Sequence, residues 1–329
     1  MIFKCRNCGG NVVYSPEKKK MYCPFCESES SEERKNYVGG IMTICPECAG
    51  EVPVLEHTSA TQCPYCDNYI ILDERVEAEY QPKMLIPFRM GKERCKEIIR
   101  EKFKKCIFAP TDFLSEARLN SMKGTYVPFW FYDYNAHYEF QGEGTKVRSW
   151  TAGNMHYTET SYYNIVRDME IPFEKIPVDA SVDMPDAIMD WMEPYNYAEL
   201  EEFRPEFLSG FYAEKYNMTS DLVESRAKTK AVEDARKLMQ QSYSGYSHVR
   251  AVRDNLAMTD SQTAYGLLPV WRYIYRYKEQ NYSFYVNGQT GKIVGTPPIS
   301  KAKVWAYAGT LWGCLTLGLT LINLIVRYI

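Results

Sequence analysis

The chain has 329 residues, a formal net charge of −3 and 11 cysteines. Its length allows two or three units of about 100 to 150 residues each. A hydrophobic share of 45% and a charged share of 25% exclude collagen-like, low-complexity and wholly disordered chains. The slightly negative net charge excludes binding to polyanions by bulk electrostatic attraction.

The N-terminal segment lacks the features of a secretory signal peptide. No run of seven or more apolar residues follows a basic start there. We therefore expect the bulk of the chain to stay in the cytoplasm. Paired cysteines in that reduced compartment are more often metal ligands than structural disulfides.

The first quarter of the chain contains a cysteine repeat with a period of 40 residues. Each copy holds two C-x-x-C pairs separated by 14 residues, a spacing that places two thiolate-bearing turns around one tetrahedral ion. The sequence therefore predicts two tandem four-cysteine zinc ribbons, over residues 1–38 and 39–78, which together bind two Zn²⁺ ions. The expected metal ligands are Cys5, Cys8, Cys23 and Cys26 in the first ribbon and Cys45, Cys48, Cys63 and Cys66 in the second.

Two other chemistries fit part of this cysteine pattern. Four thiolates would also hold iron in a rubredoxin-like site, and because ligand type alone does not separate the two metals, zinc is favoured only on general grounds. The run Cys63-Pro64-Tyr65-Cys66 matches the active site of glutaredoxins. A redox motif of that kind should open a helix of a βαβ unit, whereas this pair closes a duplicated quartet.

Zinc ribbons also bind nucleic acids, which requires Lys and Arg on the presented face. No Lys or Arg lies between Cys45 and Cys66, and the run Lys18–Lys20 in the first ribbon is typical of a solvated turn. We therefore expect the ribbons to be structural elements or protein-docking surfaces. Nucleic-acid binding is kept as the alternative.

Residues 79–300 are expected to form a cytoplasmic α+β body of helices and an antiparallel sheet. Apolar residues at three- and four-residue spacing predict helices over 92–108 and 222–241. Cys95 and Cys106 fall on the apolar face of the first helix, so we expect them to be buried. Asp221 and Glu224 have the spacing of a capping box at the start of the second.

Tyr-rich alternating segments after each helix predict the strands of the sheet. Turns are expected at Gly142 and Gly144, and a hairpin at Asn287-Gly288. The predicted strands cover 125–140, 155–167, 248–258, 265–277 and 282–286. Short echoes, such as Tyr126–Trp130 with Leu267–Trp271, suggest that the body is a duplicated unit, about 79–170 and 210–300.

The C-terminal region contains 23 consecutive residues without a charge, 304–326. As a helix they would extend about 34 Å, enough for the roughly 30 Å hydrocarbon core of a bilayer. Trp305, Tyr307 and Trp312 are typical of interfacial anchoring. The sequence therefore predicts a single transmembrane anchor over 301–329.

The charges and small residues around this anchor predict its orientation and its contacts. Lys301 and Lys303 precede the uncharged run, which places the N-terminal body on the cytoplasmic face of the cell membrane. Gly309 and Gly313 form a G-x-x-x-G step, which would allow a homo-oligomer to form through this helix.

Several of these features together resemble one protein family. The tandem ribbons, Val127-Pro128-Phe129-Trp130, Glu143-Gly144-Thr145-Lys146 and Leu267-Leu268-Pro269-Val270-Trp271 are similar to the bacterial zinc-ribbon membrane proteins of YdjG type, which carry TFIIB-type zinc fingers. The resemblance covers nearly the whole chain. It implies a membrane-bound, non-enzymatic role beside phage-shock and SPFH-type membrane-stress proteins, and it supplies no catalytic residue.

The residues themselves give little support to an enzyme. The four histidines are scattered without metal-ligand spacing, and no nucleophile elbow, phosphate-binding loop or dinucleotide motif is present. We therefore expect a membrane-anchored scaffold or adaptor that recruits other membrane-associated proteins, in a membrane-stress response. A membrane-tethered nucleic-acid binder is the alternative.

Overall fold

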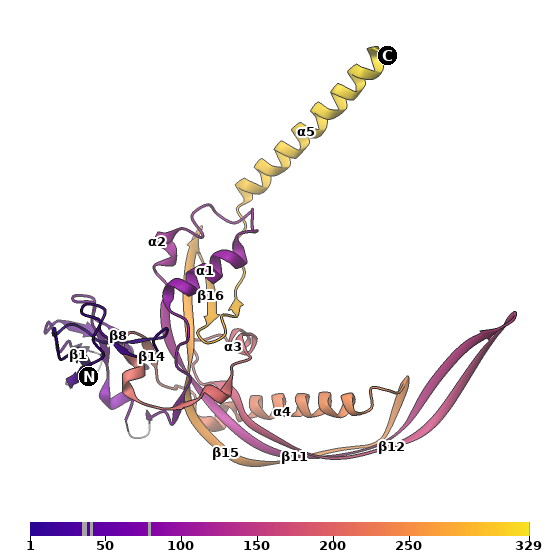
Figure 1. Cartoon of the computed structure of the whole chain (residues 1–329), viewed down its shortest axis with the longest axis horizontal. Coiled ribbons are helices and arrows are strands. Elements are labelled where there is room, and N and C mark those ends of the chain that lie inside the picture. The colour runs from indigo at the N-terminus through magenta and orange to yellow at the C-terminus, as the bar shows by residue number, and fades with distance from the viewer. Residues whose placement is uncertain (35–37, 40–41, 78–79, 329) are drawn as a thin grey trace.

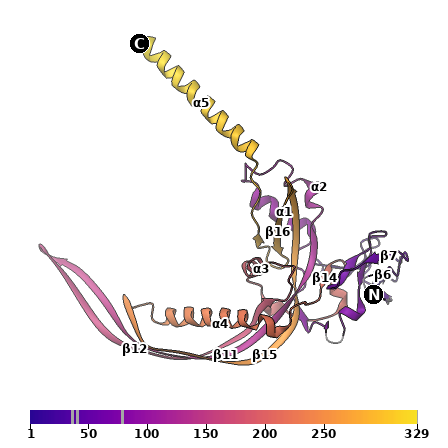
Figure 2. The same cartoon turned by 180° about the vertical axis from the view of Figure 1, so that it is seen from behind.

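The computed structural model describes residues 1–34, 38–39, 42–77 and 80–328. Figure 1 shows small N-terminal hairpins beside a central sheet, a long curved arm that extends from this sheet, and a C-terminal helix that leaves the body in another direction. The same parts are visible from behind in Figure 2. The expected α+β class is confirmed.

The N-terminal cysteine region is built from nine short strands. In the first half β1 pairs with β4 and β2 with β3, and in the second half β6 lies between β5 and β7 while β8 pairs with β9, all antiparallel. The strands are β1 (Ile2–Cys5), β2 (Val13–Ser15), β3 (Lys20–Tyr22), β4 (Ser31–Arg34), β5 (Val38–Gly39), β6 (Met42–Ile44), β7 (Glu51–Pro53), β8 (Thr58–Gln62) and β9 (Tyr69–Ile71). The boundary expected between the two ribbons, at residues 38 and 39, falls within β5, and the residues on either side of this strand lie outside the described residues.

The large sheet is mixed and reaches into the second cysteine region. Its strand order is β13-β10-β15-β11-β14-β8-β9, with β12 paired to β11, β16 to β15 and β17 to β16. The long strands pair antiparallel as expected, but β10 runs parallel to β15 and β14 runs parallel to β11. The short strands are β10 (Met84–Leu85), β13 (Glu201–Glu202), β14 (Tyr212–Glu214), β16 (Gln280–Asn287) and β17 (Ile293–Val294).

The arm consists of three very long antiparallel strands. These are β11 (Lys123–Ala152), β12 (Met155–Asp179) and β15 (His248–Tyr277). The two strands expected over 248–258 and 265–277 are therefore one strand. Pairing of β15 with β11 ends at Thr145, whereas β12 follows β11 to its end, so the tip of the arm has two strands (Figure 1).

The turn predicted at Gly142 and Gly144 is wrong, because β11 continues through both glycines. The chain reverses instead between Ala152 and Met155. A Cβ at Gly142 would lie 2.8 Å from the carbonyl oxygen of Arg250, and the pairing register with β15 shifts at this position. The glycine thus allows close approach of the neighbouring strand rather than a turn.

Helix α4 (Ser220–Ser242) lies along one face of the arm. Its buried residues recur every four positions, at Val223, Ala227, Ala231, Ala235 and Met239. They pack against aromatic side chains of β11, and the small alanines let the helix lie close to the sheet. The predicted helix over 222–241 is confirmed. The capping box is not formed, because Thr219 is the N-cap and no side chain caps the helix.

Helix α1 (Lys92–Phe103) is shorter than the predicted helix over 92–108, and residues after it form a loop that leads to α2 (Glu116–Leu119). Cys95 is buried as expected, whereas Cys106 lies in the loop and is only partly buried. Other helical elements of the described residues before α5 include α3 (Asp186–Met192) and the 3₁₀ turns Asp73–Arg75, Tyr197–Glu199 and Pro205–Leu208.

The chain reverses after Asn287 as the Asn-Gly pair predicts. The Asn287 side-chain oxygen accepts hydrogen bonds from the amides of Gln289 and Thr290, at 2.9 Å each. Each half of the body has a helix before a strand hairpin, but the halves differ in strand length. The duplication and the expected unit boundaries stay predictions.

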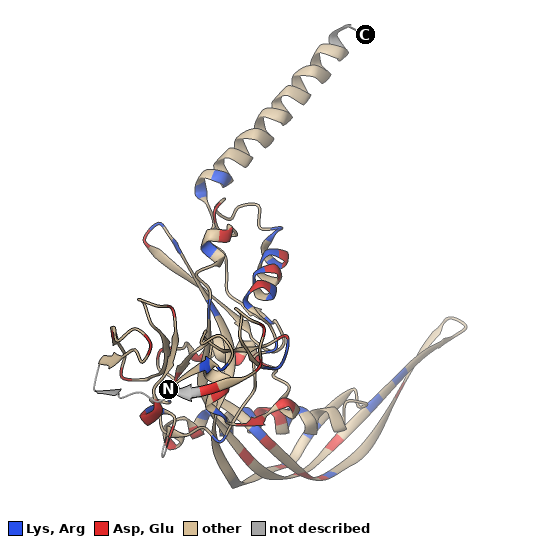
Figure 3. Ribbon diagram, turned by 60° about the vertical axis from the view of Figure 1, so that its left-hand side comes forward, with Lys and Arg blue, Asp and Glu red and all other residues tan. Residues whose placement is uncertain are grey.

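The C-terminal helix α5 (Lys301–Tyr328) projects from the body (Figure 1). Large apolar side chains along it are exposed, and Trp305 and Trp312 are the most exposed among them, at 76% and 72%. Figure 3 shows Lys residues at its base and no charged residue along the described run that follows. An exposed apolar surface of this extent is typical of sites that contact a membrane or another protein.

Candidate metal centres

Four turns of the same backbone form hold the eight cysteines. Each turn starts at the first cysteine of a C-x-x-C pair, whose N–H donates to the carbonyl five residues later. The N–H four residues later donates back to the carbonyl of that cysteine, and all eight bonds measure 2.7–3.0 Å. The residue four positions after the cysteine has a φ between 58° and 70° in every turn, and these residues are Gly9, Glu27, Ala49 and Asp67.

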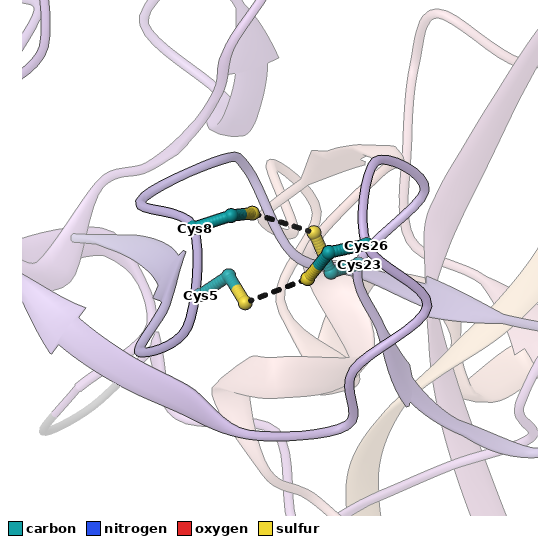
Figure 4. A group of neighbouring side chains, drawn as sticks. All are labelled: Cys5, Cys8, Cys23 and Cys26. Atoms are coloured by element: carbon teal, nitrogen blue, oxygen red, sulfur yellow. Dashed lines mark hydrogen bonds between the residues drawn. The ribbon is translucent and has the colours of Figure 1, made fainter.

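The turns face one another in pairs and bring the sulfur atoms together. In the first group the Sγ atoms of Cys5 and Cys26 are 3.5 Å apart and those of Cys8 and Cys23 are 3.6 Å apart (Figure 4). In the second group the Cys45–Cys66 and Cys48–Cys63 distances are 3.6 and 3.7 Å. Within each group all four sulfurs lie within 4.8 Å of one another.

These distances match a tetrahedral thiolate site. Zn–S bonds of about 2.3 Å in a tetrahedron place the sulfurs roughly 3.8 Å apart. Each group could therefore hold one metal ion with little movement of its side chains. The structure thus brings together all eight residues that the sequence singled out, in the two predicted sets, as expected for zinc ribbons.

Burial divides each cysteine pair in the same way. The first cysteine is buried in all four turns, whereas Cys8, Cys26 and Cys48 are exposed and Cys66 is partly buried. Each site therefore has two sulfurs set against the protein and two turned toward solvent. A metal ion could enter from the solvent side without unfolding the ribbon.

Hydrogen bonds and burial set the acidity of the thiols. A hydrogen bond from the Cys8 amide lowers the pKa of Cys5 to about 6, and the Gly50 amide lowers the pKa of Cys48. Burial raises the pKa of Cys66 to about 12. Because metal ligands are thiolates, binding of a metal would release protons from the thiols that are still protonated.

The first cysteine group is also tied to the second. Lys4 precedes Cys5 in β1 and is 2% exposed. Its ammonium lies 2.6 Å from the carboxylate of Glu47, which stands between Cys45 and Cys48 of the second group. The same ammonium donates to the Asn11 side-chain oxygen at 2.7 Å. Residue spacing does not predict this salt bridge, because Lys4 and Glu47 belong to different ribbons.

The redox interpretation of Cys63-Pro64-Tyr65-Cys66 does not fit the structure. These residues form the turn between β8 and β9 and not the start of a helix. The Cys63 sulfur faces Cys48 of the other turn at 3.7 Å. The pair therefore belongs to a four-sulfur group, as the duplicated pattern indicated.

The other clusters of ionisable groups in the described residues are already paired with one another. Arg226 of α4 contacts Asp179, Asp186 and Asp190 at 3.0–3.4 Å. On the arm, His137 lies 2.6 Å from Glu170, and this hydrogen bond raises the pKa of His137. These contacts explain both clusters as links between neighbouring elements.

The chain is 33% identical to the uncharacterized protein YdjG of Bacillus subtilis (strain 168). The alignment is 333 residues long with its gaps and covers 98% of each chain. The chain belongs to the YdjG family. No family model and no solved structure match it. Because the similarity covers 98% of the chain, it includes the regions of the cysteine groups and of the arm, and most of α5.

Helix α5 meets the physical requirements for a membrane span. Residues Lys301–Ile325 have a mean hydropathy of 1.6, and none of the most apolar stretch is buried within the chain. Among the described residues this is the one helix long and apolar enough to cross a bilayer.

Proposed function

We propose that this protein is a membrane-anchored zinc-ribbon scaffold that recruits other proteins to the cytoplasmic face of the cell membrane, in a membrane-stress response and without catalysing a reaction. Proteins of phage-shock or SPFH type are the partner classes that the family resemblance suggests. The observation that carries the proposal is the arm, whose tip presents exposed apolar side chains.

Zinc is the metal we propose for both cysteine groups. Four thiolates in a closed tetrahedral set are typical of structural zinc. The sulfurs are fixed by the backbone turns and leave no position for a substrate, which supports a structural role. Iron would fit the same ligands, so the metal content of the purified protein tests this part directly.

Helix α5 is proposed to anchor the chain, with the body in the cytoplasm. Its exposed apolar surface needs an apolar environment, and Lys301 and Lys303 at its base favour the cytoplasmic side. A variant that ends at Pro298 should move from the membrane fraction to the soluble fraction. Cleavage of the ribbons by protease added outside spheroplasts would contradict the orientation.

The arm is proposed as the surface that binds partners. At its two-stranded tip Val147, Trp150, Met155 and Tyr157 are between 40% and 62% exposed, and Tyr162 beside the tip is 79% exposed. Among the described residues β12 pairs only with β11, and residues 248–265 of β15 pair only with β11. Apolar side chains beside open strand edges are typical of surfaces that bind an additional strand or apolar segment.

Affinity capture from native membranes tests the scaffold function. We expect partner proteins to be recovered with the intact chain and lost with a Trp150→Ala/Tyr157→Ala variant. A Leu222→Ala variant is the matched control, because Leu222 is also exposed but lies on α4. Equal recovery with all three proteins would contradict a binding role for the tip.

Nucleic-acid binding is the alternative, and the charges give it little support. Lys4 is paired with Glu47, and Lys20 of the first ribbon is paired with Glu29. Positive and negative residues are both present along the arm (Figure 3), so the arm offers no surface of purely positive charge to a phosphate backbone. Capture of nuclease-sensitive nucleic acid that is released steeply by salt would establish this alternative.

A further inference from the structure

The loop between α1 and α2 packs against the first turns of α5 (Figure 1). The amide of Ser300 donates to the carbonyl of Phe108 at 2.8 Å. The ammonium of Lys303 donates to the carbonyl of Ala109 at 2.7 Å. The rings of Phe108 and Tyr307 meet edge to face at 5.6 Å between centroids. The loop is therefore held at a defined height along α5.

This height corresponds to the start of the apolar part of the helix. The uncharged run begins at Val304, and Tyr307 lies about 4.5 Å further along the helix axis at 1.5 Å per residue. Phe108 is therefore level with the first turn of the run. If α5 spans a bilayer, the loop reaches the zone where aromatic side chains collect between headgroups and hydrocarbon.

The side chains of the loop suit this zone. Ile107 is 60% exposed although it is apolar, and it stands directly before Phe108. A lone exposed isoleucine is ordinary on a protein surface, but this one continues the exposed apolar surface of α5. Lipid would cover both surfaces at once.

Positive charge surrounds the same loop. Lys102, Lys104 and Lys105 are exposed, and Lys301 and Lys303 stand at the base of α5. Within residues 101–110, Glu101 has the only side-chain carboxylate. Lys104 and Lys303 both line a cavity of about 220 Å³ between the loop and α5, which is large enough for a phosphate group.

We propose that residues 104–109 form a second membrane contact, in which Ile107 and Phe108 enter the bilayer interface and Lys104 and Lys105 bind the phosphates of anionic lipids. This inference rests on the proposed anchoring by α5 and goes beyond it. One helix alone leaves the body free to tilt about its base. A second contact beside the helix fixes the orientation of the body, and with it the direction in which the arm points.

Photocrosslinking of the full chain in native membranes tests the apolar part of the contact. A benzophenone amino acid at position 107 should give covalent lipid adducts in an amount comparable to the same probe at Leu315 of α5. The matched control is Leu55 in β7–β8, which is 78% exposed but lies among the ribbons, and it should give none. Adducts at Leu315 without adducts at 107 would overturn this proposal and leave the anchor intact. Absence of adducts at both positions would overturn the anchor itself.

Lipid selectivity tests the charged part. The full chain in nanodiscs of equal phosphatidylcholine and phosphatidylglycerol should enrich phosphatidylglycerol among the adducts at position 107. Each lysine near an anionic surface contributes about a fivefold preference, so Lys104→Glu with Lys105→Glu should remove the enrichment. Lys18→Glu with Lys19→Glu, an adjacent pair on the first ribbon, should leave it unchanged. Enrichment that persists after the first pair of substitutions would contradict lipid binding by these lysines.

Discussion

Individual residues at the cysteine sites act through backbone geometry as much as through sulfur chemistry. One residue in each turn has a left-handed backbone conformation, and only one of these four residues, Gly9, is a glycine. A non-glycine residue there carries a conformational cost. The hydrogen bonds of the turn, and a bound metal, are what would offset that cost.

Loss of one thiol should remove one metal ion and not two. The purified full chain should contain two zinc ions by elemental analysis, and Cys5→Ser or Cys45→Ser should contain one each, because each substitution removes one of four ligands from one site. Cys314→Ser is the control, since Cys314 lies in α5 outside both groups, and it should retain two ions. Loss of both ions from either ribbon variant would show that the two sites form only together.

His137 allows a prediction of pH dependence on the arm. The hydrogen bond with Glu170, aided by the nearby charges of Asp168 and Glu139, raises its pKa above the usual 6.5. Folding stabilises the protonated form of His137. Its contribution to the free energy of unfolding is therefore fully present below pH 6.5 and is lost as the pH rises through the raised pKa. Glu170→Gln should lower the His137 pKa measured by NMR titration, with His156 as the internal reference. An unchanged His137 titration would show that the contact is absent in solution.

At the scale of secondary structure elements, the arm depends on how closely its strands approach one another. Gly142 and Gly144 lie mid-strand, and side chains there would collide with Arg250 and with Ile165 and Tyr246. Their pattern looked like a turn, because glycines after an alternating segment are turn signals in most sequences. What overrides the local signal is pairing with strands that lie about 20 and 100 residues away.

Gly142→Ala should therefore destabilise the arm. A Cβ would come 2.8 Å from the Arg250 carbonyl oxygen, and overpacking of this kind costs about 1–3 kcal/mol. Hydrogen exchange over residues 134–145 should become faster and the thermal midpoint lower. Gly245→Ala is the matched control, because nothing lies within 4 Å of the added Cβ. Equal effects of the two substitutions would contradict the strand through Gly142.

At the scale of the whole molecule, the predictable parts are those encoded locally. The cysteine repeat, the apolar period of α4 and the uncharged run of α5 each lie within one segment, so their elements could be predicted from the sequence. The parallel strands β10 and β14 have two and three residues, which is too short for a periodic pattern. The packing of the ribbons onto the body depends on contacts such as Tyr14 with Phe207, whose rings are 5.0 Å apart, and these join distant segments.

Because of this packing, the first ribbon is part of the core of the body and not a separate unit. Phe3, Cys5, Tyr14 and Cys23 belong to the same buried cluster as Phe207 and Phe211 of the body. The Tyr14 amide donates to the Ser209 carbonyl at 2.9 Å, and the Ser209 hydroxyl donates to Val12. The metal in the first ribbon would therefore support part of the body as well.

Removal of the metal ions should consequently loosen the body next to the ribbon. Small ribbons bury too little apolar surface to stay folded without metal, so a chelator should unfold the cysteine turns and break the Tyr14–Ser209 hydrogen bond. Hydrogen exchange should then accelerate at Tyr14 and also at Phe211, which belongs to the same buried cluster as Tyr14 and its ring partner Phe207. Residues 134–140 under α4 provide the internal control and should keep their protection, and added zinc should reverse the change. Faster exchange only within the cysteine turns, with Tyr14 and Phe211 still protected, would contradict this prediction. The body would then hold the ribbon in place, and the metal ions would stabilise only the cysteine turns.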